Sequence, residues 1–215
     1  VDPRNYRQYV RGDIIVSLAG IATNLLLVLL FGITIALIGL IGWAALDASS
    51  APLAQAKTEL GKFASAPFPY DGLVPGSEQP FLDVLKDKRK GHRTARGSVL
   101  WQDTTFNDSR VLVHLPSGFD INRPAVMVVY FHGHGAELTR DVLERQNVPE
   151  QISASGVNAV LVAPQFAVDA ADSSAGRFWQ PGGFGRFVNE ASKKLAKLYG
   201  PPANAKKFAN MPVII

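Results

Sequence analysis

The residues best suited to chemistry stand in one short stretch, Phe-His-Gly-His-Gly at positions 131–135. It holds two of the chain's four histidines, His132 and His134, each followed by a glycine. An imidazole can transfer a proton or bind a metal ion, and a glycine lets the backbone approach a ligand closely. The stretch therefore has two interpretations: a metal site built on the two histidines, or a turn whose backbone N–H groups stabilise a negative charge.

A metal site would need further ligands besides the two histidines. His114, Asp169 and Asp172 carry suitable atoms, but their spacing does not single them out. The sequence has no cysteine, which excludes thiolate ligands and disulfides. We therefore favour the charge-stabilising turn, and we predict neither a metal nor a cofactor.

The elements that position the stretch follow from hydrophobic patterns. A continuous apolar run over 125–131 predicts a strand that is covered on both faces. Two earlier strands, over 98–106 and 109–116, are predicted to form a hairpin because Asn-Asp between them suits a turn. An amphipathic segment from Leu138 predicts a helix that is broken at Pro149. Further along, the patterns predict a buried strand at 158–164, a long loop at 165–183, a helix at 183–200 and the start of a buried strand at 211–215.

Strands that alternate with helices are typical of an α/β sheet with parallel crossovers and helices on both faces. In such sheets, ligands bind at the carboxyl ends of the strands. The stretch at 132–135 follows one predicted strand and the loop after 164 follows another, so both are expected at that edge. The candidate substrate-binding residues in the loop are Asp172, Ser173, Ser174, Phe178 and Trp179.

Residues 128–152 and 158–184 resemble a group of bacterial α/β-hydrolases, and the resemblance runs from about residue 68 to the end. It implies a partial hydrolase sheet, in which an antiparallel hairpin is followed by parallel β-α units. It also implies a role for the turn in the oxyanion hole of a serine hydrolase. The residues of that implied oxyanion turn are His132, Gly133, His134 and Gly135.

The resemblance places the nucleophile in a Gly-x-Ser-x-Gly turn after the fifth strand. No such motif occurs in the 215 residues, and Ser173 and Ser174, in Asp-Ser-Ser-Ala-Gly, are its nearest imitation. The serine, the acid and the general base are then expected beyond Ile215. The chain by itself is expected to be an inactive N-terminal portion of a hydrolase.

Residues 14–46 contain no charged side chain, a run long enough for a membrane-spanning helix. Arg4, Arg7 and Arg11 precede it, whereas residues 47–56 carry one acid and no base. The positive-inside rule then predicts a signal anchor in the lipid bilayer of a bacterial inner membrane, with the rest of the chain on the periplasmic side.

Residues 1–30 also resemble a membrane helix of the site-2 protease family. They share a basic approach that contains Pro-Arg, and Gly20 to Asn24 stand in place of that family's Gly-Pro-x-x-Asn motif, with isoleucine for proline. The zinc chemistry of the family needs His-Glu-x-x-His, which this sequence lacks. The resemblance therefore implies no peptidase activity here.

Residues 47–96 are predicted to be a linker with a basic patch, between an anchor at 1–46 and a truncated hydrolase domain at 97–215. Within the linker, residues 55–65 suit a short helix, and Phe68 and Tyr70 offer side chains to bury. Positions 86–96 hold six basic residues and one acidic one, in a chain of net charge +4. This local patch is interpreted as a solvated loop or as a contact for anionic headgroups, and no nucleic-acid partner is predicted.

Three functions follow from these patterns. The favoured one is a membrane-anchored serine hydrolase fragment, acting on an ester, amide or related acyl bond of a small-molecule substrate. The second is a non-catalytic anchored α/β module that binds a ligand at the same loops. The third is a membrane segment like that of a site-2 protease, joined to a piece of a hydrolase.

Overall fold

The computed structural model describes residue 33, residues 52–170 and residues 174–215. The predicted membrane segment, and with it the bilayer contact and the periplasmic placement, lies outside these residues except for Ile33. No helix within the described part is long and apolar enough to cross a membrane. The predicted fold class is therefore corrected in one part, the N-terminal transmembrane helix. The described residues form a mixed sheet with helices.

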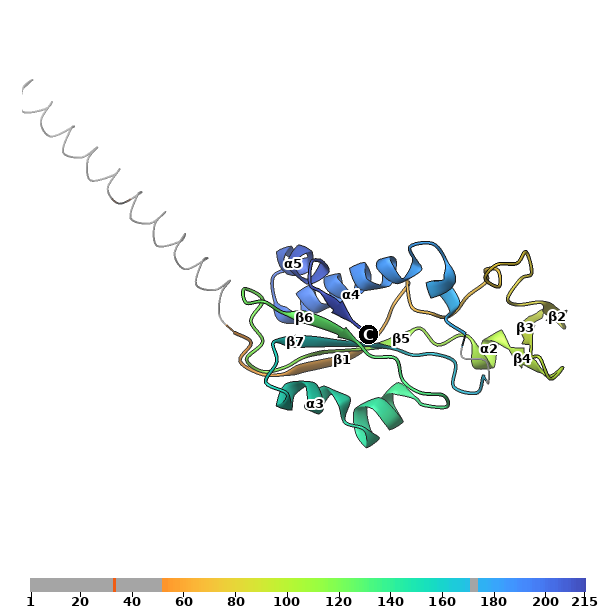
Figure 1. Cartoon of the computed structure of the whole chain (residues 1–215), viewed down its shortest axis with the longest axis horizontal. Helices are drawn as coiled ribbons and strands as arrows, with labels where there is room; N and C mark the ends of the chain where they lie inside the picture. Colours follow the sequence, from red (N-terminus) through yellow and green to blue (C-terminus); the bar gives the residue numbers. More distant parts are fainter. Residues whose placement is uncertain (1–32, 34–51, 171–173) are drawn as a thin grey trace, which may run out of the picture. The chain divides into compact units, whose positions relative to one another are not determined.

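A five-stranded sheet forms the centre of the unit that spans residues 51–215 (Figure 1). β5 runs antiparallel to both of its neighbours, whereas β6 runs parallel to β7 on one side and to β8 on the other. The strands, in their order across the sheet, are β1 (Lys57–Lys62), β5 (Arg110–Leu115), β7 (Ala159–Pro164), β6 (Val126–Val129) and β8 (Val213–Ile214).

Alternation along β5 divides the core into two layers, because successive side chains of a strand point to opposite faces. Val111 and Val113 pack in the larger core cluster with helix α4 (Gly183–Tyr199). Leu112, on the other face, packs in a second cluster with the helical segment η1 (Leu138–Arg145). All six residues of β7 are buried, as expected of a strand that is covered on both faces.

Helices cover both faces of this sheet. In the view of Figure 1, α4 and α5 (Ala205–Ala209) lie above it and α3 (Val148–Ala154) lies below it. The predicted break in the first helix is confirmed, but it falls at Asn147, which has a left-handed backbone, φ 50°. Pro149 lies in the first turn of α3, where its missing N–H removes no helical hydrogen bond. Short 3₁₀ turns occur at η2 (Gly176–Trp179) and η3 (Pro202–Asn204).

The basic patch forms part of a second, three-stranded sheet. Its antiparallel strands are β2 (Val84–Lys86), β3 (Arg89–Arg93) and β4 (Val99–Trp101), followed by the short helix α2 (Gln102–Thr105). Asp87 and Lys88 join β2 to β3 with φ values of 50° and 64°, the sign that a type I′ hairpin turn requires. The patch at 86–96 is therefore largely a hairpin rather than a loop.

The hairpin predicted between residues 98–106 and 109–116 is wrong. β4 pairs with β3, residues 102–105 are helical, and β5 pairs with β1 and β7. The Asn-Asp dipeptide does not reverse the chain into a hairpin: the Asp108 carboxylate accepts the Arg110 N–H at 2.9 Å, a local turn that starts β5.

The predicted linker is largely part of the folded unit. Residues 57–62 form strand β1, so the short helix expected at 55–65 is wrong. Phe68 and Tyr70 are buried as expected, in an aromatic cluster with Phe81 and Phe106. After β1, the Glu190 carboxylate of α4 accepts the N–H groups of Ala64 and Ser65, at 2.9 and 2.7 Å.

Candidate functional site

The stretch at 132–135 leaves the sheet at the carboxyl end of β6. The Tyr130 N–H still bonds to the Val162 carbonyl of β7 at 2.9 Å, after which the chain turns away. The turn is closed by the Ala136 N–H, which donates to the Gly133 carbonyl at 3.2 Å. Gly135 has φ +70°, which only glycine adopts without strain, so its place in the turn follows from its backbone.

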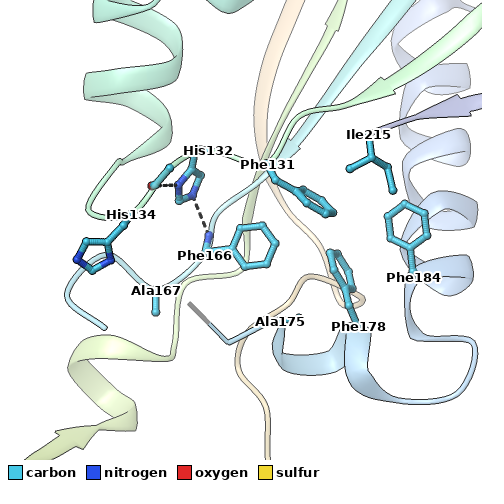
Figure 2. Close-up of a pocket in the computed structure, with 10 residues that line it drawn as sticks. Phe131, His132, His134, Phe166, Ala167, Ala175, Phe178, Phe184 and Ile215 are labelled. Carbon is cyan, nitrogen blue, oxygen red and sulfur yellow. Dashed lines mark hydrogen bonds between the residues drawn. The ribbon is translucent and has the colours of Figure 1, made fainter. Parts of the chain in front are cut away.

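His132 anchors the turn to the end of β7 (Figure 2). Its Nε2 accepts the Phe166 backbone N–H at 3.0 Å, and its Nδ1 lies 3.0 Å from the Gly133 carbonyl oxygen. A backbone N–H can only donate, so the ring carries its proton on Nδ1 and donates it to Gly133. Both ring nitrogens are therefore used in hydrogen bonds, which leaves no lone pair of His132 for a metal ion.

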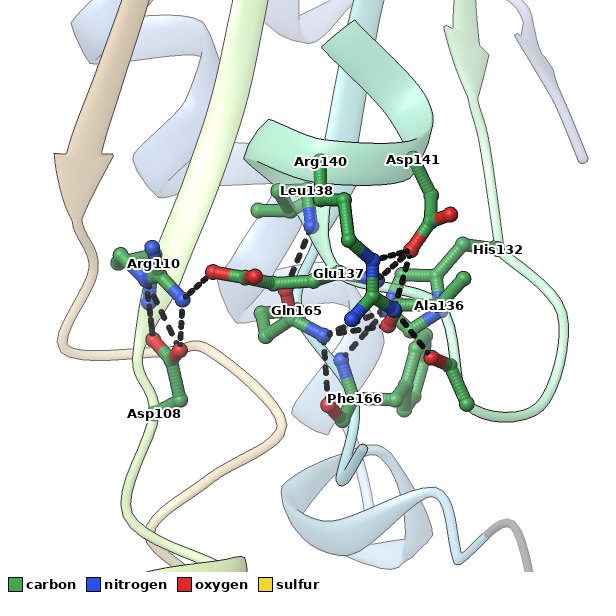
Figure 3. A network of polar contacts seen from close by, with 11 residues as sticks. Asp108, Arg110, His132, Ala136, Glu137, Leu138, Arg140, Asp141, Gln165 and Phe166 are labelled. Carbon is green, nitrogen blue, oxygen red and sulfur yellow. Dashed lines mark hydrogen bonds and ion pairs between the residues drawn. The ribbon is translucent and has the colours of Figure 1, made fainter. Parts of the chain in front are cut away.

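Gln165 ties the far end of the turn to the same strand (Figure 3). Its side chain is fully buried directly after β7. The amide nitrogen donates to the carbonyls of Ala136 and Phe166, at 3.1 and 2.8 Å, and also lies 3.0 Å from His132 Nε2. The amide oxygen accepts the Leu138 N–H, the first of η1, at 2.8 Å. One side chain thus holds the turn, the strand end and the helix start together.

A charged group fixes the outer side of the turn. Asp141 accepts the Glu137 N–H at 2.8 Å and pairs with Arg140 and Arg145, both at 2.7 Å. Hydrogen bonds from Arg140, the Glu137 N–H and Arg145 hold the pKa of Asp141 well below its usual range. Arg140 also donates to the Gly135 carbonyl at 2.9 Å, which orients the peptide after that glycine.

The hydrogen bonds of the turn leave some donors unused. Within the described part of the chain, the N–H groups of Gly133, His134 and Gly135 have no hydrogen-bond acceptor. Gly133 and His134 are exposed, and both line a pocket. Gly133 and His134 therefore place free backbone donors beside a cavity, and such donors are one component of a site that stabilises a developing oxyanion.

The pocket has a volume of about 400 Å³, and its walls are mainly aromatic (Figure 2). Phe131 follows β6, Phe166 follows β7, Phe178 belongs to η2 and Phe184 to the first turn of α4. Among the described residues, the lining includes no charged side chain, no hydroxyl and no thiol. The full lining is Phe131, His132, Gly133, His134, Phe166, Ala167, Ala175, Phe178, Phe184 and Ile215.

Strand β8 leads into the same pocket. It is parallel to β6, with Met127 opposite Val213 and Val128 opposite Ile214. Both strands therefore end at the same edge of the sheet, and Ile215 lines the pocket beside the turn. Ile215, which follows β8, therefore shares this pocket with Gly133 and His134.

The residues predicted from the loop after β7 have different positions. Phe178 lines the pocket, whereas Trp179 packs against Tyr70 and Phe81, with ring centroids 6.0 and 5.8 Å apart. Ser174 is buried and does not line the pocket. Asp172 and Ser173 lie outside the described residues.

Of the additional metal ligands considered from the sequence, His114 has both ring nitrogens in contacts away from the turn, and Asp172 lies outside the described residues. His114 is buried in β5, where its ring nitrogens contact Thr58 Oγ at 2.8 Å and Ser153 Oγ at 2.9 Å. Desolvation by burial lowers the pKa of His114. Among the described residues, no three histidine or carboxylate side chains are grouped so as to hold a metal ion.

The sequence patterns missed Gln165 and three of the four phenylalanines of the pocket. The available signal for Gln165 was its place directly after a six-residue apolar strand, at the edge where ligands bind in α/β sheets. Phe131 and Phe166 each stand two positions after the last residue of a strand, β6 and β7.

Comparison with protein-family models, with curated proteins and with solved structures gave no match. The resemblances to α/β-hydrolases and to site-2 proteases therefore stay predictions, and the site is interpreted from its own geometry.

Proposed function

We propose that the turn at 132–135 is the oxyanion-binding part of a site that hydrolyses an ester, amide or related acyl bond. The observation that carries this proposal is the pair of free N–H groups of Gly133 and His134, two residues that line an apolar pocket at the carboxyl end of β6. Such donors are most effective when they are fixed before the reaction starts. Here His132, Gln165 and Arg140 fix them through hydrogen bonds to the turn or to its ends.

In this mechanism a general base takes the proton of a serine hydroxyl as its oxygen attacks the carbonyl carbon, and the pair of π electrons moves to the carbonyl oxygen. When that pair returns, the bond to the alcohol or amine breaks and the leaving group takes the proton from the base; water then cleaves the acyl-serine in the same way and restores the hydroxyl. The turn N–H groups donate to that oxygen, and losing one such donor typically costs about 10²–10³ in rate. The direction of β8 supports a nucleophile in the turn that follows it, since Ile215 already lines the pocket. His132 acts as a positioning residue, because its ring is occupied by the hydrogen bonds that anchor the turn.

The proposal is tested by fluorophosphonate labelling of a chain that includes the residues following Ile215. We expect one labelled serine in the turn after β8, and no labelling of the 215-residue chain alone. A label on Ser173, Ser174 or another serine within the 215 residues would overturn the proposal.

A matched pair of glycine variants tests the turn itself. Gly135→Ala strains the turn, whereas Gly97→Ala places the same strain, at φ +85°, in the connection between β3 and β4. We expect Gly135→Ala to slow labelling of the extended chain by about 10²-fold, and Gly97→Ala to leave the rate unchanged. Equal rates for both variants would contradict a role of the turn in stabilising the oxyanion.

A non-catalytic binding module is the second candidate, and one observation favours it. Within the described residues, the pocket is lined by no hydroxyl, thiol or carboxylate side chain that could serve as a nucleophile. If the extended chain binds ligands at this pocket but shows no serine labelling, the binding module replaces the hydrolase.

A further inference from the structure

The pocket beside the turn has a polar end and an apolar body. The polar end consists of the Gly133 and His134 backbone, and the body is built from Phe131, Phe166, Phe178 and Phe184, together with small apolar side chains. Since no charged residue of the described chain lines it, a ligand that placed a charge in the body would lose its hydration without compensation. The lining therefore selects a ligand with one polar group at the turn and an uncharged apolar remainder.

The four phenylalanines support one another as a continuous wall. Phe166 meets Phe131 at 82° and Phe178 at 83°, and Phe178 meets Phe184 at 86°, all three in edge-to-face contact. Edge-to-face contacts are the favoured geometry of aromatic pairs and hold each ring in place. The wall is therefore formed before a ligand arrives, which is usual for small-molecule sites.

The wall also leaves apolar surface uncovered. Phe131 is 39 % exposed although it lies between the sheet and the pocket, and the cavity measures about 400 Å³. This volume is within the range of small-molecule sites, roughly 300–1,000 Å³. An acetyl group would leave most of it unfilled, whereas a longer alkyl chain would cover the rings.

We propose that this pocket binds the acyl chain of the substrate. The substrate class is then an ester or amide whose acyl group has an uncharged aliphatic chain longer than that of an acetyl group. This inference rests on the proposed function, because it places the acyl carbonyl at the turn N–H groups. Burial of each further methylene in the pocket raises affinity by up to about fourfold.

Binding of a series of carboxylates to the 215-residue chain tests the inference without any need for turnover. Acetate, butyrate and octanoate place the same carboxylate at the turn and differ in chain length. We expect octanoate to bind at least about tenfold more tightly than butyrate, measured by titration calorimetry or ligand-observed NMR. A flat series would overturn the inference.

Ala167→Phe fills the pocket from a residue outside the turn, while Ala154→Phe adds the same ring at an exposed position of α3. We expect the first variant to lower octanoate affinity by about tenfold and to leave acetate unchanged, and the second to alter neither. Equal octanoate binding by both variants would show that the chain binds elsewhere and would overturn the inference.

Aromatic walls can also bind quaternary ammonium groups. Choline and 3,3-dimethylbutanol have nearly the same shape and differ in charge, so they separate the two ligand classes. We expect the neutral alcohol to bind more tightly, and a preference for choline would overturn an acyl pocket.

The two proposals fail in different ways. Octanoate binding without serine labelling of the extended chain would refute hydrolysis and uphold the apolar ligand class. Serine labelling with a flat carboxylate series would uphold hydrolysis and refute the acyl pocket.

Discussion

Replacement of Gln165 by leucine should separate the turn from the sheet while preserving the shape of the core. The leucine side chain is close in size to glutamine, but it can neither donate nor accept a hydrogen bond. In the variant, the Leu138 N–H and the Ala136 carbonyl lose their partner, and both residues are almost fully buried, at 0 % and 6 % exposure. The Phe166 carbonyl loses a donor as well.

The cost follows from these groups. A buried polar group that is left without a partner costs about 1–3 kcal/mol, so two such groups cost roughly 2–6 kcal/mol. Burial of the apolar leucine offsets about 1.5 kcal/mol or more. We expect a net loss of about 3 kcal/mol in the free energy of unfolding. For a domain of this size, the loss corresponds to a fall in Tm of roughly 6–12 °C.

The assay is thermal unfolding of the two proteins side by side, with Gln180→Leu as the control. Gln180 is exposed, and among the described residues its side chain accepts one hydrogen bond, from Arg186 at 3.1 Å, so the same substitution there should change stability by less than about 0.5 kcal/mol. Amide hydrogen exchange should show lost protection at Leu138 in the Gln165 variant alone. A Tm within 2 °C of the parent, or an equal fall for Gln180→Leu, would refute the role assigned to Gln165.

The variant Gln165→Glu tests the same site in a second way, because the amide nitrogen is replaced by an oxygen that faces the carbonyl oxygens of Ala136 and Phe166. That arrangement raises the pKa of the new carboxyl above its unfolded value of about 4.3. Its protonated form is then favoured in the folded state, so the destabilisation should be smaller near pH 4 than at pH 7.5. A destabilisation that grew as the pH fell would contradict this account.

Three further predictions concern titration and packing. Because burial lowers the pKa of His114 below 6.5, the unfolded chain binds more protons than the folded chain, and Tm should fall as the pH falls below about 6.5. The fall should be smaller in His114→Gln, and a pH profile of Tm that is the same in the variant would contradict this prediction. The pKa of Asp141 is lowered by Arg140, by the Glu137 N–H and by Arg145, so its contribution to stability is present above its ordinary pKa of 3.8 and lost below it. Asp141→Asn should therefore lower Tm at pH 7 and by less at pH 3, and an equal loss at both pH values would argue against the pairing. Gly183→Ala would place its Cβ 2.0 Å from the Arg177 carbonyl oxygen and should lower the free energy of unfolding by about 1–3 kcal/mol, measured by chemical denaturation. Gly185→Ala, in the same helix, meets nothing within 4 Å and should be neutral or stabilising by up to about 1 kcal/mol. Similar effects of the two variants would refute the clash.

The strongest patterns of the sequence predicted the elements that carry the site. β6, β7 and α4 have long apolar runs or a clear helical stripe, and the structure confirms all three. β1 was missed because an edge strand exposes much of its surface: five of its six residues are exposed, so no alternation marks it. Its pairing with β5, about fifty residues later, replaced the local hairpin that a turn dipeptide had indicated.

The position of the candidate site at the end of a strand could be predicted from the sequence, but the contacts between its side chains could not. His132 and Gly135 could be placed at a strand end, and the positive φ of Gly135 gives a reason for a glycine there. Two partners of His132, Gln165 and Phe166, directly follow β7 more than thirty residues later, and no local pattern specifies such contacts. Phe178 and Trp179 are neighbours in sequence, yet one lines the pocket and the other packs in the aromatic cluster with Tyr70. Side-chain direction within a short 3₁₀ turn is set by this packing and cannot be read from residue type.

The contact between Glu190 and the segment after β1 has a consequence for the order of folding. The carboxylate of α4 binds backbone N–H groups that were synthesised about 125 residues earlier. Ala64 and Ser65 can therefore make this contact only after α4 has been made. Contacts of such long sequence separation slow folding, because loop closure must precede the gain from each contact. During synthesis, β1 can pair with β5 before α4 exists, whereas the segment directly after β1 gains its helix contact only later.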